Sequence, residues 1–127
     1  MMPPQLQVDV EWLKEQGRNV EVVEDGTRFY VILKAFQLPD SGQYLPSVTD
    51  LMIMPDYQYP MSRLDMYWTD PVVRLASGGL PRQADSMENY AGRSWQRWSW
   101  HYDGWNPSTH NIATHIEVFM DRLARGT

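Results

Sequence analysis

A serine, a histidine and an aspartate alternate along one short stretch of the chain, and acyl transfer uses these three residue types. The stretch runs from Trp95 to Pro107 and contains four of the six tryptophans. Ser99 is a poor nucleophile unless a base lies within hydrogen-bond reach. His101 is the nearest candidate base, and Asp103 is a candidate for orienting it. Side chains at i and i+2 of an extended segment share one side, so these three residues are predicted to line one face.

The residues between them, Trp98, Trp100 and Tyr102, are then predicted to pack into the core. Each polar residue also has a structural interpretation. Ser99 is alternatively a capping or turn serine, and His101 is alternatively a hydrogen-bonded packing residue beside tryptophans. Ser94 is a second, weaker candidate hydroxyl.

Two arginines in the same region have two interpretations. Arg93 and Arg97 are placed to grip a partner's carboxylate or to stack on the tryptophans, or else they are solvated. Exposed, coplanar tryptophans would instead suit a small domain that stacks sugars or other flat ligands.

Composition excludes several classes of protein. A chain of 127 residues with 43% hydrophobic and 21% charged residues is predicted to be one globular domain spanning 1–127. A net charge of −5 argues against nucleic-acid binding. No apolar run approaches the ~20 residues of a membrane span, and the N-terminus lacks a secretory pattern, so we expect a cytoplasmic protein.

The absence of cysteine rules out disulfides, thiolate metal sites and a cysteine nucleophile. His110 and His115 lie five residues apart, about 140° around a helix, so they do not form a metal pair on one face. The segment Ser77-Gly78-Gly79 lacks the pattern of a phosphate-binding loop. We therefore expect neither a metal nor a cofactor.

The elements that must position this stretch can be predicted from apolar patterns and breakers. Asp9 is predicted to cap a helix of about two turns that stops at Gly17, and Asp25-Gly26 is predicted to form a tight hairpin turn. Apolar runs separated by short breakers predict a four-stranded antiparallel meander. Its strands are placed at Val20–Val23, Arg28–Phe36, Val48–Met54 and Leu64–Thr69.

Beyond the meander the pattern fades, and Ala84–Tyr90 is at best a helical turn. A last helix is predicted to open at Asn106-Pro107 and to end near Gly126. Its apolar face is predicted at the spacing of a helix; these residues are Ile112, Ile116, Phe119, Met120 and Leu123. The fold class is α+β, an antiparallel sheet with a helix at each end of the chain.

Three motifs at the joints of this layout resemble the ubiquitin-conjugating (UBC) fold. Tyr59-Pro60 follows the third strand, where that fold has Tyr-Pro-x-x-Pro, although the second proline is missing. The segment from Met66 to Pro71 lies where the last strand runs into His-Pro-Asn, and Trp105-Asn106-Pro107 resembles the Trp-Ser-Pro that opens the next helix. Over residues 9–124 the chain is similar to a bacterial branch, prokaryotic family E, whose Trp-Gln-Arg-Trp-Ser-x-His motif matches residues 95–101.

The resemblance implies a carrier role in conjugation of a ubiquitin-like protein. In such pathways an adenylating activating enzyme passes the modifier to a nucleophile of the conjugating protein, and from there it reaches a target protein. Some bacterial pathways of this kind act against phage.

The family's usual nucleophile is a cysteine a few residues before Trp-x-Pro, and this chain has none. The Asn of His-Pro-Asn is also missing, because Val72 follows Asp70-Pro71. Thioester chemistry is therefore excluded for this sequence. Three alternatives stay open: an oxyester on Ser99, which lies near the family's cysteine position; a non-catalytic interaction module that docks the activating enzyme or modifier; or a natural cysteine that has been replaced.

Overall fold

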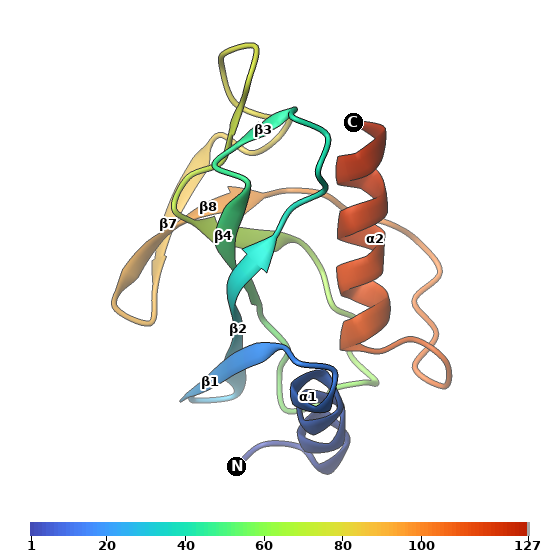
Figure 1. The fold of residues 1–127 in the computed structure, drawn as a ribbon. Coiled ribbons are helices and arrows are strands. Elements are labelled where there is room, and N and C mark those ends of the chain that lie inside the picture. The colour runs from blue at the N-terminus through green and yellow to red at the C-terminus, as the bar shows by residue number, and fades with distance from the viewer. Residues whose placement is uncertain (127) are drawn as a thin grey trace.

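The fold is an antiparallel sheet with a helix at either end of the chain, seen in a computed structural model that describes residues 1–126 (Figure 1). This confirms the α+β class. The two helices are α1 (Pro4–Glu15) and α2 (Ile112–Arg125). The strands are β1 (Asn19–Asp25), β2 (Arg28–Gln37), β3 (Tyr44–Leu45), β4 (Val48–Ile53), β5 (Tyr67–Asp70), β6 (Arg74–Leu75), β7 (Ser86–Tyr90) and β8 (Arg93–Trp98).

The main sheet has six strands in the order β1-β2-β4-β5-β8-β7, and every neighbouring pair is antiparallel. The first four are the predicted meander, and the β1–β2 hairpin turns at Gly26 as predicted. β8 and β7 extend the sheet beyond it, while β3 and β6 form a separate two-stranded ribbon.

The prediction of a helical turn at Ala84–Tyr90 is wrong. Residues Ser86–Tyr90 form β7, which pairs with β8 through a tight turn at Ala91 and Gly92. Both turn residues have positive φ, 52° and 73°, which suits a two-residue hairpin. β7 is an edge strand whose exposed side chains are polar or methionine, so it lacks the apolar alternation by which a strand is predicted.

The bounds of both helices differ from the prediction. α1 begins at Pro4 rather than Asp9, because proline suits the first turn of a helix. α2 begins at Ile112 rather than at Asn106-Pro107, since Asn111 caps it in a reciprocal pair of hydrogen bonds with Thr114. The predicted stop at Gly126 is confirmed, with φ of 78°.

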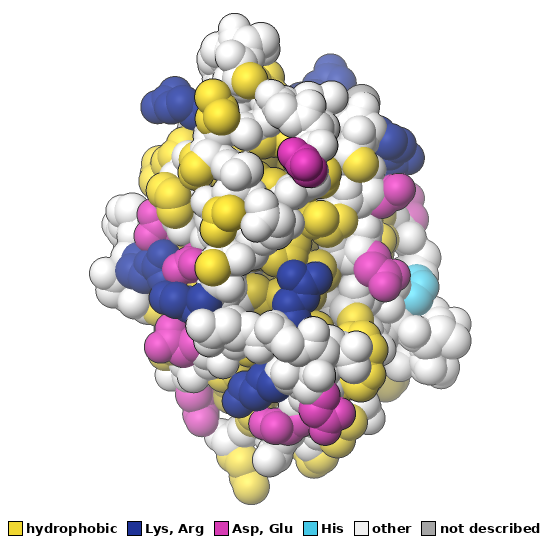
Figure 2. Space-filling model, in the orientation of Figure 1, with side chains coloured by type: hydrophobic (Ala, Val, Ile, Leu, Met, Phe, Trp, Pro, Cys, Tyr) yellow, Lys and Arg dark blue, Asp and Glu magenta, His cyan; other side chains and the backbone are white. Residues whose placement is uncertain are grey.

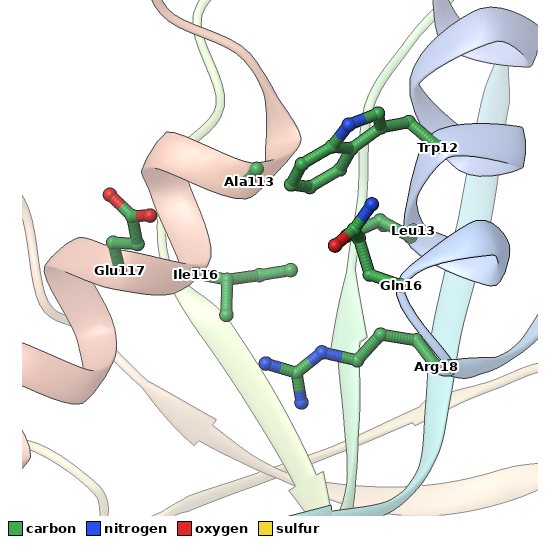
Figure 3. Close-up of a pocket in the computed structure, with 8 residues that line it drawn as sticks. Trp12, Leu13, Gln16, Arg18, Ala113, Ile116 and Glu117 are labelled. Atoms are coloured by element: carbon green, nitrogen blue, oxygen red, sulfur yellow. The ribbon is translucent and has the colours of Figure 1, made fainter.

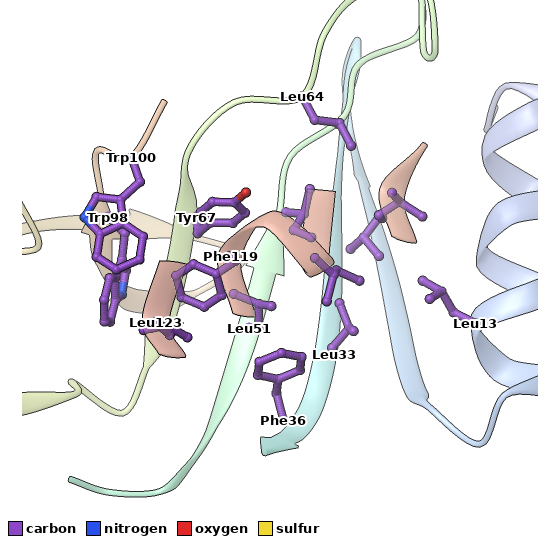
Figure 4. Packing of buried hydrophobic residues seen from close by; sticks show 14 of the residues in the cluster. Leu13, Leu33, Phe36, Leu51, Leu64, Tyr67, Trp98, Trp100, Phe119 and Leu123 are labelled. Carbon is purple, nitrogen blue, oxygen red and sulfur yellow. The ribbon is translucent and has the colours of Figure 1, made fainter. Parts of the chain in front are cut away.

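The main core lies between α2 and one face of the sheet (Figure 4). The ring of Phe119 in α2 packs against those of Tyr67, Trp98 and Trp100, at centroid distances of 4.4, 5.2 and 5.6 Å. All four side chains are buried. The end of β8 is thus joined to α2 by aromatic packing, which contributes beyond the buried area alone.

The opposite face of the sheet carries a second aromatic cluster, made of Tyr30, Ile32, Met52, Trp68 and Trp95. The sheet curls so far that Tyr30 of β2 meets Tyr90 of β7, with ring centroids 5.6 Å apart. Arg28 lies over both tyrosine rings and Arg93 lies over Trp95. Arginine stacking therefore covers this cluster, and of the alternatives left open for Arg93 the structure shows stacking on a tryptophan.

Figure 2 shows hydrophobic side chains gathered near the middle of one face, with basic and acidic groups interspersed around them. Within residues 1–126, no helix combines the length and the apolar character needed to cross a membrane.

Candidate functional site

The candidate site begins on β8, whose residues alternate between the two faces of the sheet. Trp95 is fully buried in the cluster on one face, and Trp98 is fully buried in the main core on the other. Past the end of β8, Trp100 is buried and Tyr102 half-buried, whereas Ser99 is half-buried and His101 and Asp103 are exposed. The predicted division therefore holds for the buried Trp98 and Trp100 and for the exposed His101 and Asp103, whereas Ser99 is half-buried like Tyr102.

Gln96 fixes the position of β8. Its side chain is 1% exposed and makes hydrogen bonds to three partners from other segments. Oε1 accepts from the Thr69 hydroxyl and the Val73 amide, both at 2.8 Å, and Nε2 donates to the carbonyls of Val73 and Ala84. The loop between β5 and β7 is thus bonded to the strand that leads into the site.

Ser99 is held on both its backbone and its side chain. Its amide donates to the Gln83 carbonyl at 2.9 Å, and its Oγ accepts from Arg97 Nε at 3.0 Å. Arg97 Nη1 is also 2.8 Å from Glu88 Oε2. Burial opposes ionisation of Glu88, but hydrogen bonds from Trp68 and other donors, with the charge of Arg97, outweigh it and lower the pKa of Glu88. A cation held by a carboxylate therefore touches the candidate nucleophile.

His101 is paired with an acid that the sequence analysis did not single out. Its Nδ1 lies 2.8 Å from Asp65 Oδ1, and Arg63 Nη2 lies 3.7 Å from the same oxygen. The structure therefore pairs His101 with Asp65 rather than with the predicted partner, Asp103. Since the carboxylate is the acceptor, the contact places a proton on Nδ1, so that in the neutral imidazole Nε2 is the nitrogen with a lone pair to accept a proton. Among the hydrogen bonds of residues 1–126, none joins Ser99 directly to His101.

The position of Asp65 could have been found only from the strand pairing. In the β5–β8 ladder Tyr67 lies opposite Trp98 and Trp68 opposite Arg97. Extending this antiparallel register by two residues places Asp65 opposite Trp100, next to His101. No local pattern indicates a partner 36 residues away.

Tyr102 joins the site loop to a buried histidine in α2. The Tyr102 hydroxyl is 2.7 Å from His115 Nδ1, and His115 Nε2 is 3.0 Å from the Met66 carbonyl. Because the carbonyl only accepts, Nε2 carries the proton and Nδ1 accepts from Tyr102. His115 is 0% exposed, and burial lowers its pKa to about 4. A neutral imidazole thus holds the loop.

Two of the three family motifs, Tyr59-Pro60 and Trp105-Asn106-Pro107, meet in space. Trp105 Nε1 donates to the Pro60 carbonyl at 2.9 Å. The neighbouring Tyr59 hydroxyl donates to Asp9 at 2.6 Å and accepts from the Ile112 amide at 2.9 Å. Burial raises the pKa of Tyr59, and the hydrogen bond to Asp9 adds to this effect. Asp9, predicted as a helix cap, instead lies buried within α1 and links it to the start of α2.

The tryptophans of the stretch do not offer a stacking surface. Trp95, Trp98 and Trp100 are at most 2% exposed, whereas Trp12 of α1 is 47% exposed. Trp12 borders a hollow of about 370 Å³ between α1 and α2, in which its ring and Arg18 point toward Ala113 and Ile116 (Figure 3). A flat-ligand site built from this stretch is therefore not supported.

The described part of the chain, residues 1–126, contains no group of three or more His, Cys, Asp or Glu side chains that could hold a metal ion. His110 Nδ1 accepts from the Asn106 amide, and His115 is engaged as above.

Comparison with protein families matches residues 5–126 to the model of prokaryotic E2 family E. This range covers nearly the whole chain, and the chain belongs to this family. Neither the curated proteins nor the solved structures gave a significant match. Family membership supports a ubiquitin-conjugating-like role and confirms the resemblance drawn from the motifs.

Proposed function

We propose that this member of prokaryotic E2 family E is a carrier that accepts the C-terminus of a ubiquitin-like modifier as an oxyester on Ser99. The modifier comes from an adenylating activating enzyme and passes on to a target protein. One observation carries the proposal: Ser99, whose Oγ contacts Arg97 Nε at 3.0 Å, lies two residues before His101, which is paired with Asp65. Nucleophile, cation and oriented base thus come from one short segment.

The proposed step has three parts. Ser99 Oγ attacks the activated acyl carbon of the modifier, a new C–O bond forms, and the bond to the leaving group on the activating side breaks. The hydroxyl proton goes to His101 Nε2. Asp65 stabilises the imidazolium, as the carboxylate does in Ser-His-Asp sites, and the guanidinium of Arg97 favours negative charge on Oγ.

Proton transfer from Ser99 to His101 then needs a bridging water or a loop movement on binding, because the two residues are not hydrogen-bonded to each other. Catalytic contacts in unliganded proteins are often longer than in the reacting complex. His101 is exposed and lies beyond the end of β8, so its position is less constrained than that of Trp98.

The test is adduct formation. The protein is incubated with activating enzyme, ATP and modifier, and we expect an adduct that resists thiols but is cleaved by hydroxylamine or mild hydroxide. Ser99→Ala should abolish it. Ser94→Ala is the matched control, because Ser94 is a nearby exposed serine that bonds to Asn89 instead. An adduct of the same stability on Ser99→Ala would refute the oxyester.

A non-catalytic interaction module is the second candidate. It is favoured by the engagement of Ser99 Oγ with Arg97 and by the exposed ring of Trp12 beside the hollow between α1 and α2 (Figure 3). Exposed aromatic side chains are common anchors of protein interfaces. Binding of the activating enzyme or modifier should then be unaffected by Ser99→Ala and weakened by Trp12→Ala, with Tyr57→Ala, another exposed aromatic residue, as the control.

We further propose that the pathway acts against phage in the cytoplasm: some bacterial pathways of this family do so, and the N-terminus lacks a secretory pattern. Phage should form few plaques on cells that carry the pathway with the wild-type chain. If the carrier chemistry is required for defence, the plaque number should rise on cells that carry Ser99→Ala. Equal plaque numbers on both strains would show that defence does not depend on Ser99.

A further inference from the structure

The two kinds of cationic residue are distributed unevenly along the chain. Only two of its lysine and arginine residues, Lys14 and Lys34, are lysines, and every cationic residue after Lys34 is an arginine. The difference matters for acyl transfer. A lysine amine that has lost its proton attacks an ester, whereas an arginine guanidinium stays protonated in a protein. Arginine therefore supplies positive charge without supplying a nucleophile.

The cations that border the candidate nucleophile and base are arginines. Arg97 Nε lies 3.0 Å from Ser99 Oγ. Arg63 Nη2 lies 3.7 Å from Asp65 Oδ1, the oxygen that His101 Nδ1 contacts. A lysine side chain reaches as far as the guanidinium carbon of an arginine. A lysine in place of Arg97 would therefore hold its amine within reach of an acyl group on Ser99.

Lys34 is held away from the site by an ion pair. Its Nζ lies 3.2 Å from Asp50 Oδ2, which Arg93 Nη2 contacts at 3.0 Å. Arg93 is the first residue of β8, whereas Ser99 directly follows its last residue, Trp98. The two positions are therefore about 20 Å apart along an extended strand.

Lys14 lies on a different element from the site. It is in the last turn of α1, where its Nζ is 3.6 Å from Glu11 Oε1. Figure 1 shows α1 at the lower end of the molecule, well away from the end of β8. Both side-chain amines of the chain are thus remote from Ser99, while the cations beside it are arginines.

We propose that Arg63 and Arg97 determine the specificity of transfer, because a guanidinium stabilises the site without competing with the target for the acyl group. The inference rests on the proposed function, since it requires that residue 99 carries the modifier. It adds the class of acceptor, a primary amine that belongs to another protein.

The reaction that arginine prevents is self-transfer. A neutral lysine amine attacks the acyl carbon on Ser99 Oγ, a C–N bond forms and the C–Oγ bond breaks. Oγ takes up the proton that the nitrogen releases, and the product is an amide on the carrier itself. An amine held beside the acyl group acts at a high effective concentration, so this reaction would outpace transfer to a target.

The experiment loads residue 99 chemically. Because the chain has no cysteine, Ser99→Cys introduces a single thiol. The probe is the mercaptoethanesulfonate thioester of acetyl-Leu-Gly-Gly, which passes its acyl group to this thiol by exchange, without activating enzyme or ATP. After removal of excess probe, the loaded protein is incubated at pH 7, 8 and 9. Hydroxylamine then removes the remaining thioester, and mass spectrometry with peptide mapping measures and locates the amide.

The Ser99→Cys chain is compared with three forms that also carry Arg97→Lys, Arg63→Lys or Arg18→Lys. Arg97→Lys should give about ten times more amide, at the introduced lysine, and Arg63→Lys should also exceed Ser99→Cys alone. The yield should rise with pH, because a lysine of ordinary pKa, about 10.4, then loses its proton more often. Arg18→Lys is the matched control, since Arg18 stacks on Phe36 at 5.1 Å outside the site.

Three results would overturn the proposal. One is an amide yield with Arg97→Lys and Arg63→Lys that is no higher than with Arg18→Lys. Another is equally fast amide formation at Lys14 or Lys34 in Ser99→Cys alone. The third is a Ser99→Cys thiol that takes no acyl group under conditions that load free cysteine. If Arg97→Lys does not fold, the more exposed Arg63→Lys decides; transfer with Arg97→Lys alone would remove Arg63 from the proposal.

This test and the adduct assay fail independently. Transfer to the introduced lysines without an oxyester on the wild-type chain would retain the role of the arginines and reject Ser99 as the natural acceptor. An oxyester on Ser99 without transfer to the introduced lysines would do the reverse.

Discussion

The stability of the protein should fall between pH 7.5 and pH 5 because of one buried histidine. His115 is 0% exposed, and burial lowers its pKa from 6.5 to about 4. Between pH 6.5 and about pH 4, the histidine is protonated in the unfolded chain but not in the folded chain. Stability therefore decreases as the pH falls through 6.5 and stops decreasing below about 4.

The magnitude follows from the two pKa values. At 1.36 kcal/mol for each pH unit, the difference between 6.5 and about 4 amounts to about 3 kcal/mol at most. About 2 kcal/mol of this should be lost by pH 5. The groups that face the imidazole are the hydroxyls of Tyr102 and Tyr67 and the carbonyl of Met66. Asp65 and Arg63 are the nearby charges.

The assay measures the free energy of unfolding in urea at pH 7.5, 6, 5 and 4.5, with tryptophan fluorescence as the signal. His115→Gln should be less stable than the wild type at pH 7.5, since the ring contacts are lost, but its stability should change far less with pH. His110→Gln is the control, because His110 is a partly exposed histidine just before the same helix. Asp50 and Glu88 have lowered pKa values, so the protein loses the stability that these carboxylates contribute only at more acid pH. Their effect is thereby separated from that of His115.

Two results would refute this reasoning. One is a wild-type free energy of unfolding that is flat from pH 7.5 to 5. The other is a His115→Gln variant that keeps the full decrease, since the proton would then bind elsewhere.

Three further predictions concern the supports of the site, each measured by chemical unfolding. Gln96→Ala should cost about 2–4 kcal/mol, because the buried amide and carbonyl of Val73 lose their partner; a loss below 1 kcal/mol would contradict this. Tyr59→Phe should cost about 1.5–3 kcal/mol, because the carboxylate of Asp9 loses one of its two donors and the Ile112 amide loses its acceptor, and an unchanged midpoint would speak against the link. Asn111→Ala should cost about 1 kcal/mol through loss of the helix cap, with unchanged helix content by circular dichroism as the check that α2 still forms.

Local patterns predicted those parts of the fold whose cause is local. Arg28–Phe36 is apolar enough to be recognised as a strand. The alternation along the site stretch correctly gives Trp98 and Trp100 as buried and His101 and Asp103 as exposed. The meander follows from short connections. β7 was missed because a half-exposed edge strand with Glu88 and Asn89 has no apolar alternation.

The parts that failed depend on contacts between distant segments. The acid at position 9 has the sequence features of a helix cap, and only the Tyr59 hydroxyl 50 residues away explains why it is buried. Asp65 reaches His101 through a strand pairing that no local motif specifies. The motifs with proline located the joints without revealing that Trp105 and Pro60 bond to each other.

In the site stretch, the side chains that pack in the core and the candidate catalytic side chains lie on the same short segment. A loss of activity in a variant can therefore come from lost chemistry or from a displaced segment. Trp98 and Tyr102 are fixed by Thr69 and His115, while Ser99 and His101 are the residues between or beside them. A substitution of Tyr102 would therefore move His101 without touching any substrate. The variants that report on chemistry are Ser99→Ala and His101→Gln, because both leave the hydrogen bonds of Trp98 and Tyr102 in place. Activity lost with an unchanged unfolding midpoint assigns a role in transfer, whereas activity lost together with stability assigns only support of the loop.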